Sequence, residues 1–221
     1  MRRLALLVAV LSLALGACLD PTTGTPPPVG QAVPPYASTI SAVTADQLAS
    51  SWRSGCPIGP GDLRRVRVSY WGYDGKAHSG DLIIHRLEAA DVAWAFGRLY
   101  AERFPIRQIQ PVSVFGSNDD RSMEANNTSA FNCRTVTGGT GWSEHAYGRA
   151  IDINPVQNPY VSGTGTVLPP SGRSWAERTL RVPGMIHAGG PVPRAFGAIG
   201  WGWGGTWVNS KDYQHVSSTG R

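Results

Sequence analysis

The feature that most constrains the fold is a pair of short segments, far apart in the chain, that together carry two histidines and two aspartates. The segments are SEHAYGRAID, which starts at residue 143, and DYQH, which starts at residue 212. A catalytic zinc ion typically takes three His, Asp or Glu ligands and keeps one position for water, while another carboxylate moves the proton. His145, Asp152 and His215 fit the ligands, and Asp212 fits the base. The fold must then bring both segments to one point.

The residues around Asp152 predict a short strand. From Ala150 to Asn154 apolar and polar residues alternate, so the two isoleucines share one face and Asp152 points to the other. Gly148 allows a tight bend that turns the imidazole of His145 towards the carboxylate. A separation of seven residues between the first two ligands is therefore workable.

A histidine or aspartate taken singly is a weak sign of a metal site, because most such residues are packed or solvated. Their joint occurrence favours the metal site. Asp212 and His215 are three residues apart, a spacing that brings side chains together in a local turn. His78, His85 and His187 have no carboxylate at a comparable spacing. We expect structural roles for these three, with His85 at the end of a packed strand.

The pattern Ser-x-His-x-x-Gly-x-Ala-x-Asp, followed by a late Asp/Glu-x-x-His, resembles the zinc D-alanyl-D-alanine carboxypeptidase-like family. These peptidoglycan metallopeptidases include vancomycin-resistance carboxypeptidases and L-alanyl-D-glutamate endolysins. The resemblance covers about residues 60 to 216 and is closest to a bacterial, often extracytoplasmic, branch. The further similar segments are YDGKAHSG from residue 73, FPI from 104, NNTSAFNCR from 126, IDINPVQNPY from 151 and GWGWGG from 200.

The resemblance implies zinc-dependent hydrolysis with the ligands and base named above, and it adds two residues. Arg134 matches an arginine that faces the substrate carbonyl, and Ser143 matches a serine that lines the substrate pocket. A capping serine is the alternative for Ser143. Arg121 is a second arginine candidate, but its flank NDDRS predicts a loop in which the arginine pairs with neighbouring aspartates. Val216 departs from the family, which often has an aromatic residue after the last histidine. The sequence therefore does not predict which side chain packs behind His215 and holds it in place.

The implied reaction is hydrolysis of a peptide bond in peptidoglycan stem peptides, of D,D-carboxypeptidase, dipeptidase or L-Ala-D-Glu endopeptidase type. Zinc activates water, Asp212 is the general base, and zinc and Arg134 stabilise the oxyanion. An alternative is a non-catalytic cell-wall-binding or scaffold lipoprotein on the same fold. The spare carboxylate of Asp212 argues against it, because a binding module needs no base. A peptidase of unrelated peptides is a third possibility.

The N-terminus predicts the compartment. Two arginines follow Met1, an apolar run from Leu4 to Leu15 is too short for an ordinary membrane-spanning helix, and LGAC ends at Cys18. This resembles a bacterial lipoprotein signal, with a signal peptide at residues 1–17 and lipid on Cys18; a plain signal peptide is the alternative. Residues 18–40 are expected to form a Pro-rich tether, which at about 3 Å per residue would reach roughly 60 Å. We therefore expect an extracytoplasmic protein anchored to the bacterial cell membrane.

Two cysteines remain once Cys18 is assigned to lipid. In an oxidising compartment Cys56 and Cys133 are expected to form a disulfide, which stabilises a fold by roughly 2 to 5 kcal/mol. Reduced buried thiols would fit only a cytosolic protein.

Residues 41–221 are expected to form one zinc peptidase domain. Helices are predicted over residues 45–52 and 89–103, strands over 63–70, 82–85, 109–115 and 150–154, and a Gly-rich stretch over 201–208. This order predicts an α+β fold with a small, largely antiparallel sheet, flanking helices and a zinc site at the sheet edge.

The net charge of +5 raises the question of a nucleic-acid partner. The basic residues are scattered, without a Lys/Arg block, zinc-finger spacing or recognition-helix pattern, so we expect none. A mild positive field instead favours approach to anionic wall polymers. The expected partners are peptidoglycan stem peptides and, through the lipid anchor, the membrane; we expect a monomer.

Overall fold

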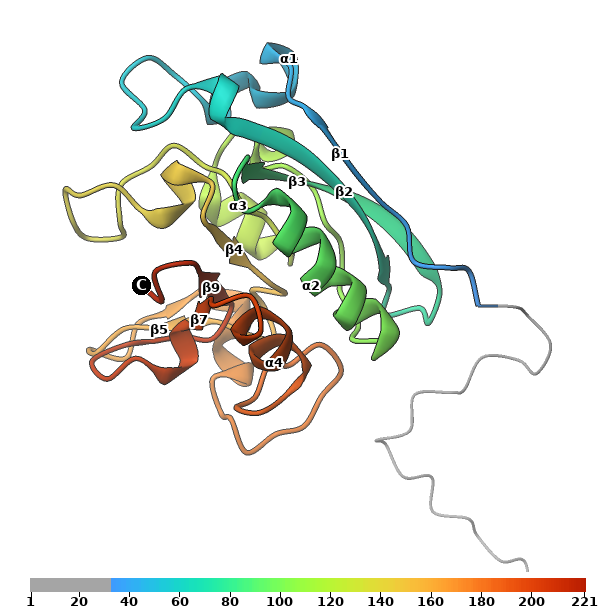
Figure 1. Cartoon of the computed structure of the whole chain (residues 1–221). Helices are drawn as coiled ribbons and strands as arrows, with labels where there is room; N and C mark the ends of the chain where they lie inside the picture. The colour runs from blue at the N-terminus through green and yellow to red at the C-terminus, as the bar shows by residue number, and fades with distance from the viewer. Residues whose placement is uncertain (1–32) are drawn as a thin grey trace, which may run out of the picture.

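The computed structural model describes residues 33–221 (Figure 1). The expected signal peptide, Cys18 and the first part of the tether lie outside the described residues. The folded domain begins before residue 41, because the Tyr36 hydroxyl donates to the carbonyl of Ala93 and strand β1 (Ser38–Ala42) pairs with strand β2 (Leu63–Trp71). The expected end of the tether at residue 40 therefore falls inside β1.

The N-terminal half is an antiparallel sheet in the order β1-β2-β3, where β3 is Ala77–His85. Helix α2 (Ala89–Ala101) packs on β2 and lies between this sheet and helix α4 (Pro191–Gly197) (Figure 1). The buried side chains of α2 recur at helical spacing, which gives the helix one apolar face. Phe96 of α2 meets Phe196 of α4 edge-on, with ring centroids 6.0 Å apart.

The C-terminal half contains two further three-stranded sheets. One has the order β4-β9-β7 and the other β6-β5-β8, and neighbouring strands in both sheets are antiparallel. Their strands are β4 (Ala150–Asp152), β5 (Tyr160–Val161), β6 (Val167–Leu168), β7 (Gly202–Trp203), β8 (Lys211–Asp212) and β9 (His215–Ser217).

Short helices fill the connections. The α-helices are α1 (Ala45–Leu48) and α3 (Asp119–Glu124), and the 3-10 helices are η1 (Ala49–Ser51), η2 (Pro60–Asp62), η3 (Val112–Phe115), η4 (Glu144–Tyr147), η5 (Pro170–Trp175) and η6 (Gly204–Thr206). None of the helices within residues 33–221 has the length and apolar character needed to cross a bilayer.

One apolar core joins the two halves. It contains side chains from β2, β3, α2 and α4, and also Ile151 of β4, Ile153 just after β4 and Val216 of β9. A smaller cluster forms around Phe131 and the Cys56–Cys133 disulfide, whose Cα atoms are 5.8 Å apart. The expected disulfide is thus present, and the strands of the expected site are built onto the main core.

The expected α+β class with small antiparallel sheets is confirmed, although the strands divide among three sheets. The predicted strand at residues 109–115 is wrong. Ile109 makes a single bridge to Thr128, and residues 112–115 form η3. Pro111 has no N–H for a strand ladder, and Gly116 adopts a left-handed φ of 67° that ends the 3-10 turn.

Candidate metal centre

The first segment turns sharply between two of the expected ligands. Ser143 caps η4, and its hydroxyl accepts a hydrogen bond from the His145 amide at 3.3 Å. Gly148 ends η4 with a φ of 64°, and a Cβ at this position would lie 2.8 Å from the His85 amide nitrogen. β4 starts two residues later and carries Asp152. The expected bend at Gly148 is therefore present, and Ser143 does act as a cap.

The second segment reaches the same place through strand pairing. β9 runs antiparallel to β4, and His215 lies directly opposite Asp152 in the register. Asp212 lies on β8 in the neighbouring sheet, opposite Tyr160. A bend at residues 213 and 214 joins the two strands, where the sequence predicted a local turn.

Three buried side chains converge on one point. His145 Nε2 is 3.1 Å from Asp152 Oδ2, His215 Nδ1 is 3.1 Å from Asp152 Oδ1, and the two ring nitrogens are 3.3 Å apart. Among residues 33–221 these three form the group that could hold a metal ion, with all donor atoms within 4.8 Å of one another. The central expectation, that residues from both segments meet, is confirmed.

Hydrogen bonds on the outer side of each ring fix which nitrogen faces the centre. His145 Nδ1 lies 2.6 Å from the carbonyl oxygen of Ala130, and His215 Nε2 lies 2.9 Å from that of Arg221. A carbonyl only accepts, so the outer nitrogens carry the protons and the inner ones present lone pairs. Metal-binding histidines are commonly oriented in this way. The donor set therefore fits a divalent cation.

The charges of the group also favour a positive centre. Burial opposes ionisation of Asp152, but the two imidazoles outweigh it and hold the pKa of its carboxyl well below the ordinary value. Burial alone would lower the pKa of His215, yet the hydrogen-bonded Asp152 raises it to about 9. Without a metal, the site thus takes up a proton.

Asp212 has a different environment from Asp152. Burial, and then the neighbouring Asp152 carboxylate, raise the pKa of Asp212 to about 6. Its Oδ1 is shielded from solvent and finds no hydrogen-bond partner among residues 33–221. A carboxylate with a free oxygen and a pKa near neutrality is suited to accept and release a proton.

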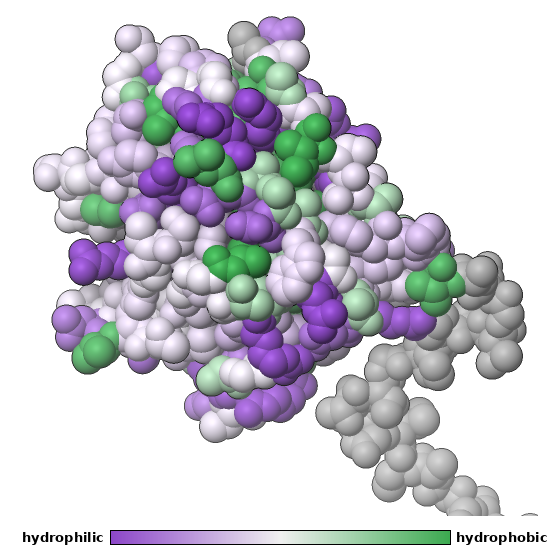
Figure 2. Space-filling view, in the orientation of Figure 1, coloured by the Kyte–Doolittle hydropathy of each residue, from purple (hydrophilic) through white to green (hydrophobic). Residues whose placement is uncertain are grey.

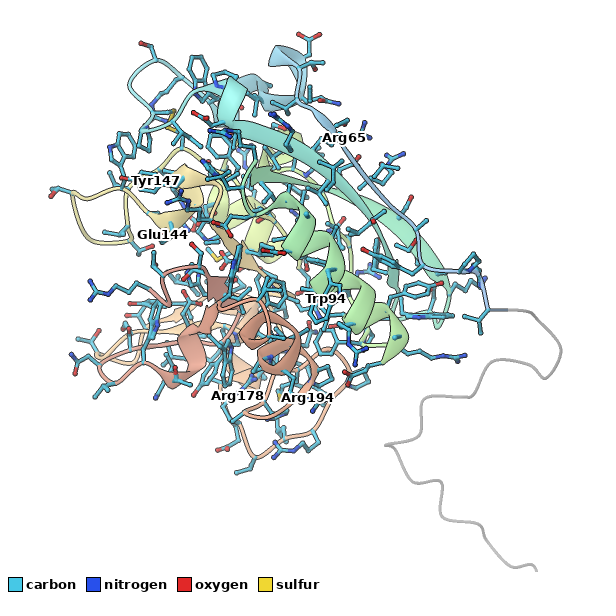
Figure 3. The ribbon with its side chains drawn as sticks, in the orientation of Figure 1. Arg65, Trp94, Glu144, Tyr147, Arg178 and Arg194 are labelled. Atoms are coloured by element: carbon cyan, nitrogen blue, oxygen red, sulfur yellow. A yellow bond between two sulfur atoms is a disulfide. The ribbon has the colours of Figure 1, made fainter. Side chains whose placement is uncertain are left out.

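A cavity of about 360 Å³ is lined by the His-Asp-His group and by the residues favoured as base, oxyanion donor and pocket serine. Its lining includes the predicted residues Arg134, Ser143, His145, Asp152, Asp212 and His215. Glu144, beside His145, also lines the cavity, and it lies on the side of η4 that faces the C-terminal strands (Figure 3). Ser143 can thus serve both as a cap and as part of the cavity wall.

The two arginine candidates differ in position. Arg134 lines the cavity, and its Nη2 is 3.0 Å from Asp119 Oδ2. Arg121 is exposed, and no ion pair to it is found among residues 33–221. The expected loop around Arg121 is wrong, because residues 119–124 form α3, capped by Asn118. Arg134, and not Arg121, therefore lines the cavity that contains the His-Asp-His group.

The sequence did not predict the other residues of the cavity lining, which include Asp119, Trp142 and Trp207. The Trp207 ring lies 5.5 Å from that of His215, while Val216 is fully buried in the main core. The ring of Trp207, the residue directly after η6, therefore packs on His215. It does so in place of the aromatic residue that the family often has directly after this histidine. Only the tryptophan-rich segment before the last ligand hinted at this contact.

The expected roles of the other histidines agree with their positions. His78 contacts Asp74 on the surface, and His187 contacts Arg181. His85 is buried at the end of β3, and its Nδ1 accepts from the Leu87 amide. None of the three belongs to the metal-ligating group.

One known family matches the C-terminal part of the chain. The family described as D-alanyl-D-alanine carboxypeptidase matches residues 137–218, a range that contains the three candidate ligands and Asp212. This match confirms the expected resemblance to the zinc D-alanyl-D-alanine carboxypeptidase-like family. No similar protein was found among curated sequences. None was found among solved structures.

Proposed function

We propose that this protein is a zinc-dependent peptidase that hydrolyses a peptide bond in peptidoglycan stem peptides, as a D,D-carboxypeptidase or an L-Ala-D-Glu-type endopeptidase. The family match and the His-Asp-His group support a metallopeptidase. The observation that carries the proposal is the meeting of His145, Asp152 and His215 in one cavity with Asp212, a carboxylate that the ligand set does not use.

His145 through Nε2, His215 through Nδ1 and a carboxylate oxygen of Asp152 would hold the ion. Two imidazoles and one carboxylate are a common ligand set for catalytic zinc. When bound, zinc supplies Lewis acidity, which lowers the pKa of water and polarises the substrate carbonyl.

The remaining steps belong to side chains of the cavity. Asp212 takes a proton from the attacking water and delivers it to the leaving amine. Arg134 donates hydrogen bonds to the carbonyl oxygen as it gains negative charge. Ser143 helps to line the substrate pocket. Because water attacks directly, no covalent bond forms between enzyme and substrate.

We further propose that the protein acts outside the cytoplasm as a lipoprotein, held by lipid on Cys18 and by the Pro-rich segment after it. The Cys56–Cys133 disulfide supports an oxidising compartment. On the face shown in Figure 2, hydrophobic residues lie in separate spots and form no broad patch for self-association. We propose that the protein acts as a monomer.

The test is mass spectrometry of purified muropeptides before and after incubation with zinc-loaded protein. We expect loss of a mass that corresponds to one stem-peptide fragment. Asp212→Ala should abolish this loss while zinc content stays near one per chain. Absence of hydrolysis by the wild type on every stem peptide would favour the scaffold alternative instead. Hydrolysis of unrelated peptides at an equal rate would contradict the proposed substrate class.

A further inference from the structure

We propose that Asp119 is a positioning residue, whose carboxylate holds the guanidinium of Arg134 in place for catalysis. This inference rests on the proposed function, in which Arg134 donates to the substrate carbonyl. Asp119 lies on α3, far from both metal-binding segments in the sequence, yet it lines the same cavity.

The Asp119 carboxylate bridges two side chains. Its Oδ2 lies 3.0 Å from Arg134 Nη2, and its Oδ1 accepts a hydrogen bond from Asn132 Nδ2 at 3.4 Å. Only 25% of the Arg134 side chain and 23% of the Asp119 side chain are exposed. The ion pair is therefore shielded from much of the solvent that weakens a surface pair.

The Arg134 main chain is fixed independently of this ion pair. Its amide donates to the Asn132 carbonyl at 2.8 Å, and its carbonyl accepts from the Ser143 amide at 3.1 Å. The preceding residue is bound through the disulfide to Cys56. The root of the side chain is thus rigid, but several rotatable bonds still separate it from the guanidinium.

Other contacts to the guanidinium are few. Nη1 donates to the carbonyl of Thr135, the next residue, at 3.2 Å, and the buried Nε has no partner among residues 33–221. Asp119 is thus the charged group that holds the guanidinium. A donor stabilises an oxyanion only if it lies within about 2.7–3.1 Å of it, so a loss of orientation costs rate.

Helix α3 offers a matched control. Asp119 and Asp120 occupy its first turn, where both interact with the helix dipole. Asn118 caps this turn by accepting a hydrogen bond from the Arg121 amide at 2.9 Å. Asp120 is exposed and is not part of the cavity lining. Asp120→Asn therefore removes the same helix-terminal charge without touching Arg134.

The test is a double-mutant cycle on stem-peptide hydrolysis by the zinc-loaded full chain. We expect Asp119→Ala to lower kcat about 10- to 100-fold, less than the 100- to 1,000-fold loss expected for Arg134→Ala. KM and zinc content should stay within about twofold. Asp119→Ala should add little in the Arg134→Ala background, because it acts through that residue. Asp119→Glu should recover part of kcat, and Asp120→Asn should leave it unchanged.

Circular dichroism identifies any variant that fails to fold, and Asp119→Asn, which preserves the shape of the side chain, then replaces Asp119→Ala. Independent, multiplying losses in the double variant would overturn the inference, as would an equal loss in Asp120→Asn. An active wild type with fully active Asp119→Ala and Asp119→Asn would overturn this inference alone. A wild type that hydrolyses no stem peptide would overturn the proposed function and this inference together.

Discussion

At the scale of single residues, the two aspartates of the site have different surroundings and therefore different pKa values. Asp152 is held ionised between two imidazoles, whereas Asp212 has a pKa raised to about 6 and a free oxygen. This difference supports the proposed roles of Asp152 as a ligand and of Asp212 as the general base.

The Asp212 environment predicts the acidic limb of the pH profile. A base acts only when it is deprotonated, so kcat/KM should fall as pH drops below the pKa of Asp212, which is about 6 without a metal. A bound cation favours the ionised form, so the midpoint should lie at or below about 6. The measurement is kcat/KM from pH 4 to 8 for the wild type and Asp212→Glu. A profile that the substitution leaves at the same midpoint would assign the limb to another group.

The His215–Asp152 pair predicts how the stability of the metal-free protein depends on pH. The folded pKa of His215 is about 9, above its ordinary 6.5, so its contribution is complete below about pH 6.5 and disappears as pH rises through 9. The pKa of Asp152 is lowered, so its contribution is lost only in strong acid. Urea unfolding should therefore show a loss of stability between pH 6.5 and 9 in the metal-free wild type. A His215→Asn variant that shows the same loss would contradict this assignment.

The sequence predicted that His145, Asp152 and His215 meet, because imidazole and carboxylate groups lie at short spacings within each segment. It did not predict the Asp119–Arg134 ion pair, because no sequence pattern indicates which residue an aspartate in the first turn of α3 will contact. The packing of Trp207 on His215 was missed for the same reason. Both contacts depend on how separate loops meet.

At the scale of elements, strong periodicity was the reliable guide. The alternation in β2 and the helical spacing in α2 predicted those elements closely, since each buries one continuous face. The two-residue strands β5, β6, β7 and β8 carry too few residues for any period to appear. These short strands nevertheless place Asp212, so part of the site had no local signal.

The bend at Gly148 predicts a coupling between backbone conformation and metal affinity. Gly148 lies between His145 and Asp152 in the sequence. Gly148→Ala would put an alanine at a φ of 64°, with its Cβ 2.8 Å from the His85 amide nitrogen. Gly116→Ala is the control, because its φ is 67° but nothing lies within 4 Å. The control should lose about 1–2 kcal/mol of stability and keep its zinc affinity. Gly148→Ala should lose more stability and bind zinc more weakly in a competition titration; equal zinc affinities would show that the bend does not position the ligands.

At the scale of the whole molecule, one core supports both halves of the site. Ile151, Ile153 and Val216 flank the ligands and belong to the same cluster as β2 and α2. The N-terminal sheet thus supports the metal-binding strands although it contributes no ligand. The sequence predicted the α+β class but not the division into three sheets, because register and strand order depend on contacts between distant segments.

The proposed anchor predicts where the full-length protein is found. With lipid on Cys18, the chain should fractionate with bacterial membranes and be released by detergent. Cys18→Ser should move it to the soluble extracytoplasmic fraction while stem-peptide hydrolysis is retained. Immunoblotting of the fractions is the measurement. A variant that stays with the membrane would show that something other than Cys18 anchors the protein.

The most direct test of the central claim is anomalous diffraction at the zinc absorption edge from crystals of the zinc-loaded protein. We predict one strong peak, bound by His145 Nε2, His215 Nδ1 and a carboxylate oxygen of Asp152, with Asp212 beside it but not bound to it. A peak at any other position, or no peak between these three side chains, would contradict the account.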